Sequence, residues 1–323
     1  MFRLVLARLL ALIPLLLGVS FVSFLLIHLA PGSFVDRLRL DPGIPSSTIE
    51  ALVVRFGLDR PWYEQYLSWL TGAVHGDLGW SLAFRRPVGE LLGGAAFYTL
   101  ALLLTALVVS ALVGTVLGLL SVVRPRGALD RVFCGLALAT VSVPTLVLAL
   151  AGLGLASATA VLPIGGGSVT AAVDLNWTAR ATDFMRHLLL PALILSIATC
   201  PLFFLQARGG LLDVLSAEFL WAARSRGLSE TQILLRHSLR PSLVPLIAFV
   251  GASMTRMLNS ALLIEVVVGW PGMGRLALQG LLARDSFLIL GVLVLGSIFV
   301  VLGNLVTDLL LPVADPRIRL EEA

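Results

Sequence analysis

Few residues in this chain have the types and spacing that catalysis needs. No lysine is present, which excludes Schiff-base chemistry and a P-loop, whose Lys must reach the nucleotide phosphates. Asp308 is the only carboxylate placed well inside an apolar stretch, whereas an intramembrane aspartyl protease needs two that share a proton. The four histidines are too far apart in the sequence to have metal-ligand spacing; they are His28, His75, His187 and His237. We therefore predict no catalytic, metal or cofactor site here.

Two further features only partly resemble known sites. Gly269, Gly272 and Gly274 have the composition of a phosphate-binding loop, but they follow an apolar helical run and not a strand. They therefore indicate a turn. Cys134 and Cys200 both fall inside apolar runs, which does not indicate a disulfide framework.

The composition sets the class of protein. Hydrophobic residues make up 58% of the chain, charged residues make up 13%, and the mean hydropathy is +0.98. These values are typical of a polytopic membrane protein. The net charge of +4 suits basic cytoplasmic loops and does not indicate a nucleic-acid partner.

The first apolar run, residues 9–27, follows Arg3 and Arg8 and is long enough for a helix to cross a bilayer. A signal peptide is the alternative. The run is longer than a usual signal-peptide core, and residues 28–30 form a poor cleavage site. We expect a retained membrane helix.

Five more apolar runs predict an all-α polytopic membrane protein with six transmembrane helices. Pro144 is expected to kink the third span, and Pro312 is expected to end the sixth. The runs cover residues 91–123, 132–162, 188–207, 241–264 and 286–311.

Residues 31–90 are mixed in charge, with amphipathic pieces at 48–56 and 62–74, and predict a small ordered lobe outside the bilayer. The expected domains are therefore an N-terminal helix (1–30), this lobe (31–90), a five-helix membrane core (91–312) with a cytoplasmic loop (208–245), and a tail (313–323).

Arginine counting predicts the orientation. With both termini in the cytoplasm, the cytoplasmic segments carry twelve Arg and the short outside loops carry four. Positive residues favour the cytoplasmic side, and long translocated segments such as 31–90 are excluded from the count. The sequence predicts a multi-pass protein of a bacterial cytoplasmic membrane, with both termini inside.

The charged stretch 216–245 lies between two of the spans and is predicted to form two short helical pieces. Ser216 is expected to cap the first piece, and Gly227 to close it in the left-handed conformation. Ser229-Glu230-Thr231-Gln232 has the pattern of a capping box, which predicts the start of the second piece.

This stretch resembles the cytoplasmic coupling loop of ABC importer permeases, whose general pattern is Glu-Ala-Ala, three residues, Gly. Trp221-Ala222-Ala223 and Gly227 fit that spacing, and the run 223–229 is similar to the oligopeptide/dipeptide permease branch. Trp221 occupies the position of the acidic residue in the general motif. Glu218, one helical turn earlier, must therefore supply the acidic group. Further motifs stand in the family's order at 30–32, 58–61, 76–79, 265, 270–274 and 315–317.

The resemblance implies the type I ABC importer (MetI-like) permease fold and a role for the loop in coupling to an ATPase. Small side chains permit close approach to a groove, while aromatic side chains supply anchors. Anchoring of the aromatics in the headgroup layer and simple orientation by the arginines are the alternatives. The implied coupling residues are Glu218, Phe219, Trp221, Ala222, Ala223, Arg224, Arg226 and Gly227.

The fifth span departs from the family pattern, because it carries Arg256 and Asn259 one turn apart. A charge near the membrane midplane costs about 3 kcal/mol and normally faces a cavity or a partner. One hypothesis is that Arg256 lines the translocation path and attracts a peptide carboxylate. The alternative is a structural ion pair with Glu265, Asp308 or another subunit.

The resemblance also implies partners: a second homologous permease, two ATPase subunits that bind ATP and Mg, and an extracytoplasmic solute-binding protein. Asp77, Trp270 and Pro271 are candidate contacts for the binding protein. Peptides are the expected substrates, and nickel or glutathione are alternatives within the family. A secondary transporter is a more distant alternative, because we find neither internal repeats nor ionisable relays.

Overall fold

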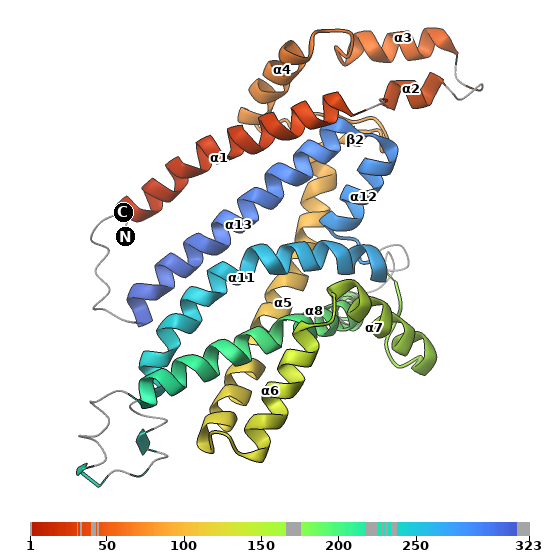
Figure 1. The fold of residues 1–323 in the computed structure, drawn as a ribbon. Helices are drawn as coiled ribbons and strands as arrows, with labels where there is room; N and C mark the ends of the chain where they lie inside the picture. The colour runs from red at the N-terminus through yellow and green to blue at the C-terminus, as the bar shows by residue number, and fades with distance from the viewer. Residues whose placement is uncertain are drawn as a thin grey trace. The chain divides into compact units, whose positions relative to one another are not determined.

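Helices dominate the chain in this computed structural model, which describes residues 2–30, 32, 34–39, 43, 45–165, 176–216, 225–227, 229, 232–233 and 238–314 (Figure 1). Among these residues, five helices are long and apolar enough to cross a membrane. They are α1 (Phe2–Leu29), α5 (Val88–Val123), α8 (Trp177–Leu215), α11 (Leu239–Val268) and α13 (Ser286–Ala314).

The sixth candidate span is a broken one. α6 (Ala128–Val141) and α7 (Thr145–Thr159) meet at an angle of 101°. Pro144 precedes α7 in an extended conformation, with φ −57° and ψ 139°. Because proline has no N–H and disfavours a helical residue before it, the helix ends here. The kink predicted from Pro144 is therefore a full change of direction, and counting the pair as one span gives the six that were predicted.

α8 is longer than predicted at both ends. The Asn176 side chain caps its start by accepting a hydrogen bond from the Ala179 N–H at 3.0 Å. At its other end Ser216 is helical, with φ −83° and ψ −8°, and its hydroxyl bonds back to the Asp213 carbonyl at 2.7 Å. The prediction that Ser216 begins a new helix is therefore wrong. The last turns persist because Leu211 is buried against Val122.

Two other boundaries differ from the prediction. α13 continues through Pro312 to Ala314, because a proline near a helix end removes only one hydrogen bond. The stretch expected as a loop after α11 contains a further helix, α12 (Met273–Ala283), with Met273, Leu276 and Gly280 on its buried side. Apolar spacing at three and four residues marks that helix.

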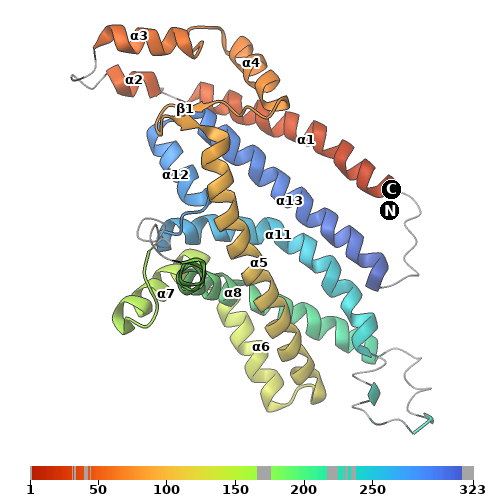
Figure 2. The same cartoon turned by 180° about the vertical axis from the view of Figure 1, so that it is seen from behind.

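The chain forms two compact units. The first contains residues 1–8, 100–270 and 300–323. In it α8 packs against α6, α7 and α11, as both views show (Figures 1 and 2). Its core includes Phe203, whose ring meets that of Phe249 edge-on at 5.1 Å. α5 approaches α8 closely at Gly114, where a Cβ would lie 2.8 Å from the Phe204 backbone nitrogen.

The second unit contains residues 9–99 and 271–299. Its short helices are α2 (Phe34–Arg39), α3 (Ser46–Arg55) and α4 (Trp62–Val74), so the amphipathic pieces predicted at 48–56 and 62–74 are helical. A two-stranded antiparallel ribbon follows, β1 (Trp80–Ser81) and β2 (Arg86–Pro87), with Ser81 opposite Arg86.

An aromatic cluster holds the second unit together. Tyr66 and Trp69 on α4 pack against Phe24 on α1 and Leu290 on α13. The Tyr66 hydroxyl lies 3.1 Å from that of Ser20, so the ring is buried with its polar end paired. This cluster fixes α4 against two long helices.

Candidate functional site

The predicted coupling loop follows α8, and part of it is described. Gly227 has φ +79°, the left-handed conformation predicted for it, and Arg226 beside it is exposed. A Cβ on Gly227 would meet no atom within 4 Å. Glycine is therefore required by backbone conformation and not by crowding. The other predicted coupling residues lie outside the described residues: Glu218, Phe219, Trp221, Ala222, Ala223 and Arg224.

The capping box predicted at Ser229 is confirmed by its hydrogen bonds. The Ser229 N–H donates to the Gln232 side-chain oxygen at 3.1 Å, and the Gln232 N–H donates to the Ser229 hydroxyl at 3.3 Å. Such a pair satisfies two N–H groups at a helix start. Ile233 follows and is fully buried, so this piece of the loop is anchored by an apolar side chain.

A buried ion pair stands where α8 leads into the coupling loop. Asp130 on α6 is 3% exposed and accepts two hydrogen bonds from Arg208 on α8, at 2.7 and 2.8 Å. It also accepts from the Ser121 hydroxyl and from the Arg126 N–H, the latter at 2.8 Å. The carboxylate thereby ties the end of α5, the turn after it and α6 to α8.

Sequence reasoning missed this pair. From the sequence, no role is predicted for Asp130 or for Arg208. One signal in the sequence is that Asp130 is a single acid close to three arginines, at the start of a run that forms helix α6. Only the packing of α6 on α8 shows that the two side chains meet.

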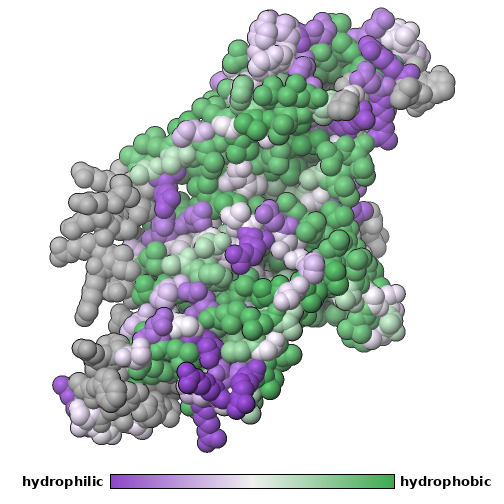
Figure 3. Space-filling view, in the orientation of Figure 1, coloured by the Kyte–Doolittle hydropathy of each residue, from purple (hydrophilic) through white to green (hydrophobic). Residues whose placement is uncertain are grey.

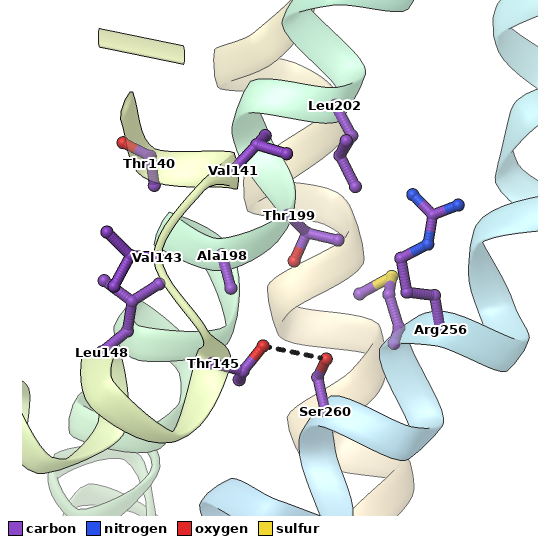
Figure 4. A pocket seen from close by; sticks show the side chains of 11 residues that line it. Thr140, Val141, Val143, Thr145, Leu148, Ala198, Thr199, Leu202, Arg256 and Ser260 are labelled. Atoms are coloured by element: carbon purple, nitrogen blue, oxygen red, sulfur yellow. Dashed lines mark hydrogen bonds between the residues drawn. The ribbon is translucent and has the colours of Figure 1, made fainter. Parts of the chain in front are cut away.

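Arg256 lies near the middle of α11 and lines a cavity of about 290 Å³. The cavity is lined by residues around the break between α6 and α7, on α8 and on α11. Figure 4 shows Ser260 facing Thr145, and the Arg256 guanidinium directed away from that pair. The Ser260 and Thr145 hydroxyls lie 3.5 Å apart across it. The lining residues are Thr140, Val141, Val143, Thr145, Leu148, Ala198, Thr199, Leu202, Arg256, Met257 and Ser260.

Neither Asn259 nor Asp308 has the relation to Arg256 that the sequence suggested. Asn259 is exposed, but it does not line the cavity; Ser260, four residues after Arg256, does. Asp308 pairs with Arg8 at 2.7 Å, so the alternative in which it pairs with Arg256 is wrong. Among the described residues, none forms an ion pair with the Arg256 guanidinium.

The three candidate contacts for a binding protein differ in exposure. Asp77 is exposed and accepts a hydrogen bond from the Gly79 N–H at 2.9 Å, and Pro271 is half-buried. Trp270 is fully buried and packs beside Phe184, with the ring centroids 5.7 Å apart. Its side chain cannot contact a partner at the surface, because it is fully buried within this chain.

The glycine-rich run beside Trp270 forms a turn between helices. Gly269 ends α11 with φ +78°, and Gly272 precedes α12 in an extended conformation. The Met273 N–H donates to the Thr99 hydroxyl at 2.8 Å. The first N–H of α12 is therefore satisfied by a side chain, as expected of a turn. In the described part of the chain, no three His, Cys, Asp or Glu side chains are grouped to hold a metal ion.

Comparison with known families gives two matches. The model of the family described as binding-protein-dependent transport system inner membrane component matches residues 114–320. The model for the N-terminal part of such membrane components matches residues 1–83. Together the two matches cover most of the chain.

The chain is also similar over its full length to individual proteins. It is 35% identical to a protein of Brucella suis named as a peptide permease, over 99% of each chain. It is 32% identical to the oligopeptide transport system permease protein AppB of Bacillus subtilis, over 98% of each. It is 32% identical to the glutathione transport system permease protein GsiC of Escherichia coli strain K12, over 99% of each.

One solved structure shares the fold. A chain of the MetNI methionine ABC transporter, in an inward-facing conformation, matches with a TM-score of 0.58 and 19% identity. The match covers 70% of this chain and 96% of that chain. The predicted fold class, an all-α membrane protein with the type I importer architecture, is confirmed.

Proposed function

Because the chain belongs to the binding-protein-dependent transport system inner membrane components, we propose that it forms half of the translocation pathway of an ATP-driven peptide importer. It is a multi-pass inner-membrane protein of that family. The observation that carries the peptide assignment is the full-length similarity to two proteins named for peptide transport, at 35% and 32% identity.

The partners follow from the architecture of such importers. A second permease completes the pathway, two ATPase subunits bind ATP and Mg and engage the loop after α8, and an extracytoplasmic protein delivers the solute. Support for the loop's role comes from the left-handed Gly227 and the capping box at Ser229, which are the local conformations that the sequence of the family pattern predicts at these positions. The ion pair of Asp130 with Arg208 holds α8, the helix that precedes the loop, against α6.

The orientation proposed places both termini and the loop after α8 in the cytoplasm. Arg8, Arg124, Arg126, Arg131 and Arg226 are all exposed, as residues that favour the cytoplasmic face should be. On this orientation the unit containing α2, α3 and α4 faces the binding protein, with Asp77 and Pro271 as candidate contacts.

The translocation pathway is proposed to include the cavity beside Arg256. An intramembrane charge normally faces water or a partner, and this side chain lines a cavity. Glutathione is the alternative substrate favoured by a specific observation, the 32% identity to GsiC. Since glutathione is a tripeptide, both alternatives place a peptide in the same pathway.

The test is ATP-dependent uptake by the complete importer. The chain is co-expressed with a candidate second permease, ATPase subunits and binding protein, purified by a tag on this subunit and reconstituted in liposomes. We expect Walker-motif ATPases to co-purify and labelled di- and oligopeptides to accumulate with ATP. Accumulation of nickel without any peptide would refute the peptide assignment.

The coupling proposal is tested with Gly227→Asp and Ala223→Arg. Both variants are expected to remain in the membrane and to lose ATP-driven uptake, because each places an unpaired charge where the loop is proposed to meet the ATPase. Normal uptake by either variant would contradict the coupling role.

A further inference from the structure

Arg256 carries a charge in the middle of a membrane helix, and the described residues do not neutralise it. The guanidinium is exposed, and no described carboxylate pairs with it. Figure 3 shows hydrophilic surface over the middle of α11, on a face that is otherwise largely hydrophobic. An unpaired cation in the hydrocarbon region costs about 3 kcal/mol, so an anion or water must face it.

The cavity beside Arg256 carries one sign of charge. Among its eleven lining residues Arg256 is the only charged side chain, and none is acidic. A low-dielectric wall around a single cation concentrates its field. The cavity therefore attracts anions and repels cations.

Two hydroxyls in the lining of the cavity are free to donate to a ligand. Those of Thr140 and Thr199 are not, because each already donates to a carbonyl of its own helix. Among the described residues, Thr145 and Ser260 have only the long 3.5 Å contact with each other, so either O–H can turn to a ligand. Figure 4 shows the Arg256 guanidinium directed away from this pair of hydroxyls. The cavity thus offers one cationic donor and, apart from it, two neutral donors.

We propose that the Arg256 guanidinium binds, in this cavity, the carboxylate of the transported solute, which for a peptide is its C-terminal carboxylate. The inference rests on the proposed function and deepens it. A carboxylate offers two acceptor oxygens, which suit two parallel N–H groups of the planar guanidinium. The C-terminal carboxylate is common to linear peptides of any sequence, so a site that binds it accepts many side chains.

The size and the remaining lining fit one end of a peptide. A cavity of about 290 Å³ lies just below the usual range for small-molecule sites, about 300 to 1,000 Å³, and so suits one end of a larger solute. Val141, Val143, Leu148 and Leu202 supply an apolar wall for the terminal side chain. Peptides of different lengths then share one anchored end, while the rest of the chain lies elsewhere in the pathway.

The first experiment compares two peptides in the reconstituted importer. One tripeptide has a free C-terminal carboxylate, and the other is its C-terminal amide; binding of each to the isolated binding protein is measured separately and used to normalise uptake. Arg256→Gln is expected to lower uptake of the free acid about 10- to 100-fold, the worth of one charge-assisted hydrogen bond, and to change uptake of the amide less than about twofold. Arg256→Lys should restore part of the loss.

Arg186→Gln is the matched control, because it removes the same charge from an exposed position of α8 that does not line the cavity. It should leave the ratio of acid to amide uptake unchanged. An equal loss for both peptides in Arg256→Gln would overturn the proposal and assign Arg256 to a structural pair with another subunit.

The second experiment does not depend on transport. In the complete importer with Cys134→Ala and Cys200→Ser, Ser260→Cys is labelled with an anionic and with a cationic methanethiosulfonate. The anionic reagent should react faster than the cationic reagent, relative to their rates with a free thiol. Adding Arg256→Gln should lower this ratio of the anionic to the cationic rate at least threefold. N-acetylalanine should slow labelling, and its amide should not. No labelling, or a ratio independent of Arg256, would refute the site.

The two experiments separate the two claims. If the wild-type importer transports neither peptide, the peptide assignment fails, while the labelling ratio still decides whether the cavity binds carboxylates. If peptides are transported and the labelling ratio ignores Arg256, the proposed function stands and the carboxylate site is refuted.

Discussion

Arg208 donates two hydrogen bonds to the Asp130 carboxylate, at 2.7 and 2.8 Å, and so joins the last turns of α8 to the first turn of α6. The arrangement is bidentate, which fixes the relative direction of the two side chains as well as their distance. Since α8 ends at Leu215 and the proposed coupling loop follows, this pair sets where the loop leaves the helices.

Removing one partner of this pair should be strongly destabilising. Asp130→Asn leaves a guanidinium that is 24% exposed without its anion, and a broken buried pair typically costs about 3 to 5 kcal/mol. We expect the thermal unfolding midpoint of the purified subunit to fall by about 10 °C. Glu90→Gln, which breaks the exposed pair with Arg86, should change it by no more than about 2 °C. Equal shifts would show that burial is not decisive.

Gly227 should tolerate substitution according to backbone preference and not size. With φ +79° and open space around a Cβ, asparagine can adopt the conformation, whereas a β-branched side chain cannot without strain. Gly227→Asn should keep at least half of ATP-driven uptake, and Gly227→Val should lose about 90%. Gly165→Val, which also has a positive φ of +97° and open space, is the control and should keep uptake. Equal uptake by the Asn and Val variants would contradict the role of the conformation.

The close approach of α5 to α8 at Gly114 predicts a steric effect. A Cβ there would lie 2.7 Å from that of Phe203 and 2.8 Å from the Phe204 nitrogen, so Gly114→Val must push the helices apart. We expect a cost of about 1 to 3 kcal/mol, seen as a lower unfolding midpoint and less protein in the membrane. Gly93→Val on the same helix, where a Cβ meets nothing within 4 Å, should behave like wild type. A midpoint lowered as much by the control would point to helix propensity instead.

Loss of the Asp285 side chain should lower the stability of the subunit, whereas loss of the Asp77 side chain should weaken its proposed contact with the binding protein. Asp285 is 1% exposed and accepts hydrogen bonds from the Ser81 hydroxyl at 2.7 Å, the Ala83 N–H at 3.0 Å and the Leu288 N–H at 3.2 Å. Asp285→Ala leaves these donors unpaired, and we expect a loss of about 2 to 4 kcal/mol in stability.

Asp77→Ala should leave the unfolding midpoint within about 2 °C, because this exposed side chain accepts one local hydrogen bond. It should instead weaken stimulation of the ATPase by the binding protein. An unfolding midpoint lowered equally by both variants would argue against a contact role for Asp77.

Local pattern was sufficient for much of the fold and for part of the site. Apolar runs of span length predicted the long helices, because bilayer thickness and helical rise fix the required number of residues. The left-handed Gly227 and the capping box at Ser229 were also predictable, because each depends on a few neighbouring residues. The family motifs added the architecture, and they imply the proposed coupling role.

Other features depend on which helices pack together. The pairs of Arg208 with Asp130 and of Arg8 with Asp308 join residues 78 and 300 positions apart, which no local pattern relates. The length of α8 depends on the burial of Leu211, and the buried side chain of Trp270 depends on its surroundings and not on its motif. The cavity of Arg256 exists because the break at Pro144 brings Thr145 opposite Ser260. Tertiary packing alone therefore determined which charged and polar groups meet, since long-range contacts are set by the fold as a whole.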